Sequence, residues 1–221
     1  NGRITMIDVS IIVTNYNYGK YLPRSLRSCL SQKNINHEVI LVDDNSEEKI
    51  DKFIQPFLEN NRFTLVKNRN NVGVSASANN ALKIAKGQFV IRVDADDYVN
   101  ENFLLFLHEF MEQNKEIDAV ACDYLLVDKK ENVIERKNCN HYPIGCGILF
   151  KTENLFEIGL YDEDFKLNEE KDLRIRFEKK YNIYRLRLPL YRYRRHQNNI
   201  TNDSEGMIEH DKKLERKHKL L

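Results

Sequence analysis

The sequence predicts an α/β fold with a mixed, mostly parallel central sheet flanked by helices. Short apolar runs rich in β-branched residues alternate with helix-like segments through the first half of the chain. This β-α-β-α-β-α-β order is typical of a doubly wound sheet with right-handed crossovers. Three of the runs end in polar or acidic residues, at the edge where open α/β sheets bind ligands.

The elements of the first half follow one another with short connections. The run at residues 9–14 is continuous, as in strands buried on both faces. Pro23 fits the first turn of a helix, Ser46 is a suitable N-cap for the next, and Gly87 stands where the third should stop. The expected strands cover residues 9–14, 38–43, 63–66 and 88–93. The expected helices cover residues 21–32, 46–58 and 75–86.

The second half is less regular. A hairpin is expected over residues 128–130, and the tail at residues 204–221 reads as a charged helix. No repeat or low-complexity linker separates the two halves, so one domain is predicted. The expected strands are 119–127, 133–136, a Gly-rich segment at 143–150, and 183–194. The expected helices are 101–113, 154–157 and 170–180.

Composition narrows the class of protein. The chain has 221 residues, enough for one domain with a substantial core. Its net charge of +1 gives no field that would attract nucleic acid. The four cysteines lack zinc-ligand spacing, so free thiols in a reducing compartment are expected. No apolar run reaches the roughly 18–20 residues that span a bilayer, which predicts a soluble, cytoplasmic protein.

Three aspartates follow the last strand of the first half. Asp94, Asp96 and Asp97 would place acceptor-only oxygens at the edge of the sheet. Such oxygens suit Mg²⁺ or Mn²⁺, and a cation that holds a diphosphate is the usual reason to gather them. An acidic turn explains the same residues about as well, because Asp is favoured in turns and at N-caps.

The other two strand ends carry further candidates. Thr14 and Tyr16 could hold a nucleotide base by hydrogen bonding and stacking, or form an ordinary polar loop. Asp44 could accept the imide N–H of uracil or a ribose hydroxyl, or serve as a turn residue. Both interpretations stay open on these residues alone.

Charged residues in later segments complete the set. Arg69 precedes a helix N-terminus and could pair with a diphosphate, although its loop is too poor in glycine for a P-loop. Glu169 and Glu170 begin a helix, whose N-terminus favours the ionised carboxylate that a general base needs. A solvated helix start is the alternative. His196 could be a surface histidine, a metal ligand or a diphosphate contact.

Taken in order, these segments resemble the family 2 glycosyltransferases of the GT-A fold. The likeness covers nearly everything from residue 9 to residue 201, and five elements in order are far more specific than a lone Asp-x-Asp. The matching segments are VSIIVTNYN (9–17), EVILVDDNS (38–46), the N-x-G-x-S-x-x-x-N-x-A-L…A-x-G segment (71–87), FVIRVDADD (89–97) and EEKDLRIR (169–176).

The resemblance implies a role for each candidate residue. Thr14, Tyr16 and Asp44 would bind the base of a nucleotide-sugar donor. Asp94 would bind its ribose, and Asp96 would bind the Mn²⁺ or Mg²⁺ that bridges the two phosphates. The other residues that it implies are Arg69, Asn79 and Ala95 at the donor, His196 at the metal or diphosphate, and the acidic pair Glu169 and Glu170 at the catalytic centre.

Two positions depart from the family pattern. Glu170 stands where the family usually has its catalytic Asp, so the carboxylate is displaced by one methylene. Ala78 precedes Asn79 where the family often has Arg, which leaves Arg69 as the expected phosphate contact. The segment at residues 142–150 follows the small-residue loop that lines the acceptor pocket in relatives.

The resemblance therefore predicts a metal-dependent, inverting transfer of sugar from a nucleotide sugar, with UDP as the expected nucleotide. The expected acceptor is a glycan or lipid-linked saccharide, in surface polysaccharide synthesis, with peripheral association at the inner face of a membrane. Residues 1–203 would form the catalytic domain, with a donor half at 8–98 and an acceptor half at 99–203. Two alternatives remain open, a sugar-1-phosphate nucleotidyltransferase and a non-catalytic nucleotide- or sugar-binding domain.

Overall fold

The computed structural model describes residues 6–196 and 204–219. The strands are β1 (Val9–Asn15), β2 (His37–Asp43), β3 (Phe63–Lys67), β4 (Phe89–Asp94), β5 (Tyr98–Val99), β6 (Ala119–Val127), β7 (Val133–Lys137), β8 (Ile148–Lys151) and β9 (Ile183–Arg194). The helices are α1 (Leu22–Leu30), α2 (Asp51–Ile54), α3 (Val74–Leu82), α4 (Phe103–Gln113), α5 (Thr152–Glu157), α6 (Glu169–Glu178) and α7 (Ser204–His218).

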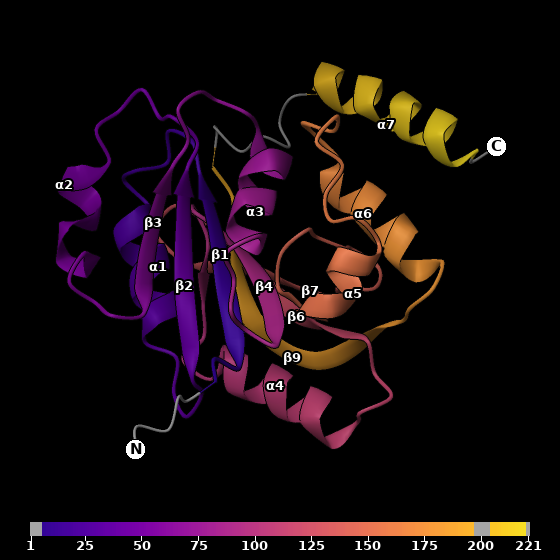
Figure 1. Ribbon diagram of the computed structural model, residues 1–221, viewed down its shortest axis with the longest axis horizontal. Coiled ribbons are helices and arrows are strands. Elements are labelled where there is room, and N and C mark those ends of the chain that lie inside the picture. The colour runs from indigo at the N-terminus through magenta and orange to yellow at the C-terminus, as the bar shows by residue number, and fades with distance from the viewer. Residues whose placement is uncertain (1–5, 197–203, 220–221) are drawn as a thin grey trace.

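Within the described residues, these strands form one mixed sheet in the order β3-β2-β1-β4-β8-β6-β9-β5, with β7 paired to β6 (Figure 1). The four strands of the first half are all parallel, and the pairing becomes antiparallel where β4 meets β8. Thr14 lies opposite both Val42 and Asp94 in the register. The polar ends of β1, β2 and β4 therefore meet at one level of one edge.

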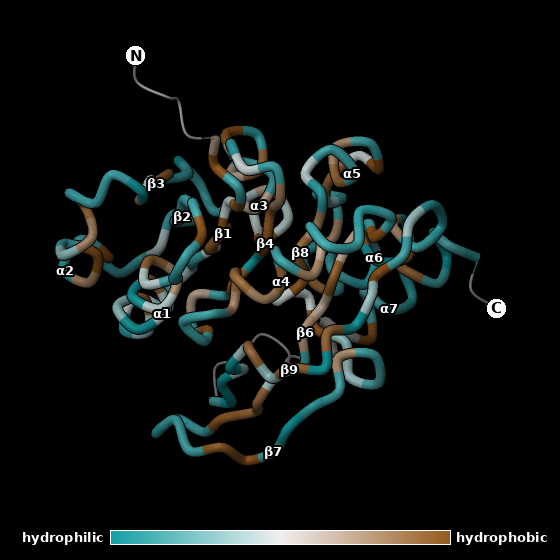
Figure 2. The backbone as a smooth tube through the Cα atoms, turned by 90° about the horizontal axis from the view of Figure 1, so that it is seen from below, coloured by the Kyte–Doolittle hydropathy of each residue, from teal (hydrophilic) through white to brown (hydrophobic). Residues whose placement is uncertain are grey.

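Helices cover both faces of the sheet (Figure 2). Alternate residues of β1 belong to two different cores: Ile11 and Val13 pack with α1, α2 and α4, whereas Ile12 packs with α3, α5 and α6. This period of two is what a strand buried on both faces requires. The arrangement confirms the predicted α/β class and the predicted single domain, with helices on either side of a mixed sheet.

The second predicted helix begins later than expected. It starts at Asp51 instead of directly after Ser46, and the 3₁₀ turn Gln55–Phe57 continues it. Ser46 does not cap it, because its hydroxyl donates to the Asp43 carboxylate at 2.6 Å and accepts the Asn17 N–H at 3.0 Å. The serine therefore closes the loop after β1 onto the end of β2.

Gly87 has a different role from the predicted helix stop. Helix α3 ends at Leu82, several residues earlier. The Gly87 N–H donates to the Ser10 hydroxyl at 2.8 Å, and a Cβ there would collide with the backbone nitrogen of Ser10. Glycine is needed here for the close approach of two backbones.

The second half matches the predicted order of elements with two differences. The Gly-rich segment forms a strand only over β8, because Gly147 adopts φ +71°, a left-handed conformation that interrupts an extended run. The two-residue strand β5 was not predicted, since two residues give no periodicity. It pairs with β9 and so joins the end of the acidic segment to the far edge of the sheet.

The predicted charged tail forms α7 within the described residues, and it packs beside α6 (Figure 1). Leu214 is buried, and Asp211 accepts hydrogen bonds from Lys171 and Asn168, each at 2.8 Å. All four cysteines are free and buried, as expected. Among residues 6–196 and 204–219, no helix combines the length and the apolar character needed to cross a bilayer.

Candidate active site

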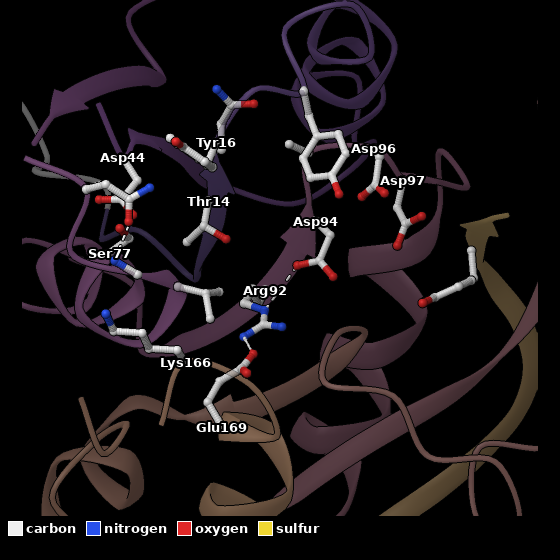
Figure 3. Close-up of a pocket in the computed structure, with 17 residues that line it drawn as sticks. Thr14, Tyr16, Asp44, Ser77, Arg92, Asp94, Asp96, Asp97, Lys166 and Glu169 are labelled. Atoms are coloured by element: carbon white, nitrogen blue, oxygen red, sulfur yellow. Dashed lines mark hydrogen bonds and ion pairs between the residues drawn. The ribbon is translucent and has the colours of Figure 1, made fainter. Parts of the chain in front are cut away.

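A cavity of about 470 Å³ opens at the carboxyl ends of β1, β2 and β4 (Figure 3). Its lining brings together most of the donor residues predicted from the sequence. Those residues are Thr14, Tyr16, Asp44, Asp94, Ala95 and Asp96. The parallel register explains the convergence, because the three strands end at one level of the sheet.

Asp44 shapes one wall of the cavity. Its Oδ1 accepts the Asn68 side-chain amide at 2.8 Å and the Val72 N–H at 2.9 Å, and its Oδ2 accepts the Gly73 N–H at 2.8 Å. A carboxylate offers about four acceptor positions, so one remains for a ligand donor. Gly73 adopts φ +90°, which glycine permits at no steric cost, and α3 begins directly after it.

Asp96 and His196 meet although they lie far apart in the sequence. The Oδ2 of Asp96 is 2.7 Å from the Nε2 of His196, and the imidazole stacks on Tyr21 with ring centroids 4.9 Å apart. A carboxylate oxygen suits Mg²⁺ or Mn²⁺, and an imidazole nitrogen is a ligand for divalent transition metals. Two protein ligands are also the usual number where phosphates complete the coordination of a divalent cation. No cluster of three or more metal-binding side chains occurs in the described part of the chain, so substrate oxygens would have to supply the rest.

Asp97 also lines the cavity, but both of its carboxylate oxygens are held by β9. The Tyr191 hydroxyl donates to its Oδ2 at 2.6 Å, and the Arg194 N–H donates to its Oδ1 at 2.8 Å. Burial, together with the negative charges of Asp96 and Asp94, holds the pKa of Asp97 well above its usual range. The side chain therefore anchors the acidic loop to β9.

Arg92 was missed by sequence reasoning. It projects from β4 between two carboxylates: its Nε lies 3.2 Å from Asp94 Oδ1, and its Nη1 lies 2.9 Å from Glu169 Oε1 (Figure 3). Lys166, from the segment before α6, also lines the cavity and was not predicted. One feature of the sequence could have identified Arg92: it is the one charged residue in the apolar run at residues 89–93.

Glu169 and Glu170 begin α6, after Asn168 in a left-handed conformation. Glu169 lines the cavity, and Glu170 packs against the loop before β8, where a Cβ on Gly145 would lie 2.7 Å from its Cβ. Burial and the charge of Glu169 raise the pKa of Glu170 to about 7, against the opposing effect of Arg92. A carboxyl group with this pKa can exchange a proton near neutral pH.

Two predicted donor residues lie outside the cavity lining. Asn79 is buried and ties α3 to the segment before α6: its amide donates to the Tyr161 carbonyl and to Glu163, each at 2.9 Å, and its Oδ1 accepts the Tyr161 N–H at 3.0 Å. Arg69 is exposed on the loop before α3. The structure gives Asn79 an architectural position and leaves Arg69 at the surface.

A mixed α/β sheet with carboxylates gathered at the carboxyl ends of its parallel strands, close to an acidic pair that begins a helix, is the arrangement expected of a GT-A type transferase domain. The chain belongs to glycosyltransferase family 2, since residues 10–174 match the model described as "Glycosyl transferase family 2". The predicted family and fold are thereby confirmed.

Curated relatives of the chain are named as a glycosyltransferase and a hyaluronan synthase. The chain is 33% identical over 124 residues to glycosyltransferase GlyG of Streptococcus pneumoniae, a match to 56% of this chain and 41% of that protein. It is 30% identical over 117 residues to a hyaluronan synthase of Pasteurella multocida, covering 52% of this chain and 12% of the synthase. The chain thus spans less than half of the length of either relative.

Solved structures show the same fold. Residues 1–349 of Staphylococcus aureus TarS in complex with UDP-GlcNAc align with a TM-score of 0.78 at 21% identity, covering 90% of this chain and 61% of that one. The mannosyltransferase PcManGT of Pyrobaculum calidifontis, in complex with GDP-Man and Mn²⁺, aligns with a TM-score of 0.71 at 18% identity, covering 89% and 59%.

Proposed function

We propose that the chain transfers a sugar from a UDP-sugar donor to an acceptor hydroxyl, with inversion and with the help of a divalent metal. The observation that carries the proposal is the convergence of Thr14, Asp44, Asp94 and Asp96 on one cavity that Glu169 also lines. Membership of the family supports the transferase activity. The nucleotide-sugar complexes of TarS and PcManGT support this class of donor.

In the proposed reaction, the side chains divide between donor and acceptor. Thr14, Tyr16 and Asp44 hold the base, and Asp94 holds the ribose. Glu170 accepts the proton of the acceptor hydroxyl as that oxygen bonds to the anomeric carbon and the nucleoside diphosphate departs from the opposite face. A positioned base of this kind contributes about 10²–10⁴ in rate.

Asp96 and His196 would hold the Mn²⁺ or Mg²⁺. When bound, such a cation neutralises the charge that builds on a departing diphosphate. The Arg194 guanidinium donates to the Asp96 carbonyl at 2.8 Å and so fixes the backbone of the proposed metal-binding loop.

The acceptor would enter beside the loop at residues 142–147, where Gly145 packs against Glu170. We propose that the acceptor is a hydroxyl group of a glycan or lipid-linked saccharide used in surface polysaccharide synthesis.

A thermal-shift screen of nucleotide sugars, with and without Mn²⁺, tests the donor, because a ligand that binds only the folded state raises its stability. A UDP-sugar should raise the melting temperature most, and only with the metal present. Asp96→Asn should abolish this metal-dependent shift and lower turnover more than about 100-fold, beyond the loss caused by residues that merely support a metal ligand. Asp51→Asn, an exposed aspartate paired with Lys67, is the matched control.

Two results would overturn the proposal in different ways. Release of pyrophosphate from a sugar phosphate and a nucleoside triphosphate would identify a nucleotidyltransferase. Nucleotide binding without hydrolysis of any UDP-sugar, and without transfer to any acceptor, would identify a binding domain. Inversion is checked by the anomeric configuration of the product in its proton NMR spectrum.

A further inference from the structure

Arg92 is a buried cation that contacts two separate parts of the site. Only 9% of its side chain is exposed, and it pairs with Asp94 at 3.2 Å and with Glu169 at 2.9 Å. Its Nε also donates to the Cys146 thiol at 3.3 Å. Asp94 belongs to β4 and Glu169 begins α6, so one guanidinium connects the donor-binding strand with the helix that carries Glu170 (Figure 3).

The shape of the guanidinium matters for this connection. Arginine presents five N–H donors in a rigid planar fork, whereas lysine presents one compact ammonium on a flexible stem. In Arg92, different nitrogens face the two carboxylates. A buried charge is tolerated when it is paired and hydrogen-bonded, and here both partners and the thiol meet that requirement. A lysine at this position would keep the charge and lose the simultaneous contact.

The surroundings leave little freedom for movement. A Cβ on Gly145 would lie 3.0 Å from the Nη2 of Arg92 and 2.7 Å from the Cβ of Glu170. The backbone of this loop is thus packed against both the guanidinium and the start of α6. Because protein interiors are close-packed, a shift of Arg92 has to be passed on to Glu170.

We propose that Arg92 is a positioning residue, which fixes the base-bearing end of α6 against the donor-binding end of β4 by pairing with Asp94 and Glu169 together. The inference rests on the proposed role of Glu170 as the base. Arg92 would act through other residues, because it holds the Glu170 carboxylate, the proposed general base, in a fixed position relative to the donor.

The same contact has an electrostatic consequence. The charged groups that act on Glu170 are Glu169 and Lys171 on its own helix and Arg92 on β4. Burial and Glu169 raise the pKa of Glu170, whereas Arg92 and Lys171 lower it. Removing Arg92 while Glu169 is absent should therefore raise the pKa of Glu170.

Kinetics of Arg92→Lys and Arg92→Gln test the geometric part. Misplacement of a reacting group by about 1 Å can cost about 100-fold in rate, so both variants should lose kcat on that order. The affinity for UDP, measured by calorimetry with Mn²⁺, should change by less than about tenfold, since both variants keep the residues proposed to hold the nucleobase, the ribose and the metal. Arg187→Gln, an exposed arginine on β9, is the control and should keep wild-type kcat.

The pH profile tests the electrostatic part. Glu169→Gln and the double variant Arg92→Gln/Glu169→Gln are compared, and the acidic limb of kcat/KM should lie at higher pH in the double variant. A role confined to folding would lower the melting temperature without moving this limb. The double variant leaves neither charge of the Arg92–Glu169 pair buried and unpaired, and the remaining partner, Asp94, is partly exposed, which keeps the variant measurable.

Wild-type kcat in Arg92→Lys would overturn the inference, because charge alone would then suffice. An unmoved acidic limb in the double variant would overturn it as well. Failure of the proposed function gives a different result: Glu170→Gln would itself remain active. If Glu170→Gln is inactive and Arg92→Lys behaves as the wild type, only the role of Arg92 is refuted.

Discussion

Two pairs of adjacent acidic residues lie at the cavity, which Asp96, Asp97 and Glu169 line and Glu170 does not, and the two members of each pair have different contacts. Asp96 and Asp97 follow β4, while Glu169 and Glu170 begin α6. In each pair one carboxylate is held by the neighbouring strand, Asp97 by β9 and Glu169 by β4. The other carboxylate is the one proposed to act on the ligand, Asp96 through the metal and Glu170 as the base.

The partners of the two held carboxylates differ. Asp97 accepts a phenol O–H and a backbone N–H, which are neutral, and burial together with the negative charges of Asp96 and Asp94 keeps its pKa well above the usual range. Glu169 is paired with the guanidinium of Arg92. The donors to Asp97 are neutral and add no positive charge beside it, whereas Glu169 has a counter-charge in Arg92. The comparison is consistent with the proposed cation at the first pair and the proposed proton transfer at the second.

Removing the base should have the largest effect. Glu170→Gln keeps the shape of the side chain and removes its ability to accept a proton, so kcat should fall by about 10²–10⁴. Affinity for the donor should stay near that of the wild type. Steady-state kinetics with a saturating UDP-sugar measure the loss, and Glu178→Gln at the exposed end of the same helix is the control. Equal activity in the two variants would remove Glu170 from the mechanism.

Asp97→Asn should have the next largest effect, and on stability. Both oxygens of Asp97 accept a donor, so the amide must turn its NH₂ toward either the Tyr191 hydroxyl or the Arg194 N–H. A buried unsatisfied group costs about 1–3 kcal/mol in the free energy of unfolding. Chemical denaturation measures this difference, and Tyr191→Phe relieves one of the two donors. A double variant no more stable than the sum of the single changes would mean that the contact is unimportant.

A change in pH dependence should be the subtlest effect. The base must be deprotonated, so kcat/KM of the wild type should rise as the pH increases through about 7, the pKa of Glu170. Burial and then the charge of Glu169 cause this raised pKa. Glu169→Gln removes a negative neighbour, and the acidic limb should therefore move to lower pH. A limb that stays in place, or moves to higher pH, would show that another group controls it.

The donor half was predictable because its signals are local. The runs that became β1, β2 and β4 are apolar and β-branched, and parallel crossovers bring their ends to one edge whatever the details of the helices between them. Thr14, Asp44 and Asp94 therefore follow from pattern and topology. Ser46 shows the limit of local signals, because its hydroxyl is taken by Asp43 and a capping pattern cannot reveal such competition.

The connections between the halves were not predictable in the same way. Arg92 is a single charged residue in an apolar strand, and its partner Glu169 arrives from a distant helix only when the chain has folded. Lys166 reaches the cavity from a loop whose course no periodicity describes. Asn79 fits a sequence motif, yet its amide binds the backbone of Tyr161 because α3 and the segment before α6 pack together. Each of these depends on tertiary contacts across the sheet.

The three N–H groups that converge on Asp44 have a further consequence. They hold the carboxylate in one orientation and anchor the turn at residues 68–73 around it. The nucleobase proposed to bind here would thus meet a rigid, preorganised acceptor and lose little affinity to the ordering of that turn. Removing the Asp44 carboxylate would loosen the turn as well as delete the proposed acceptor, so nucleotide selectivity and the form of the pocket would be coupled at this position.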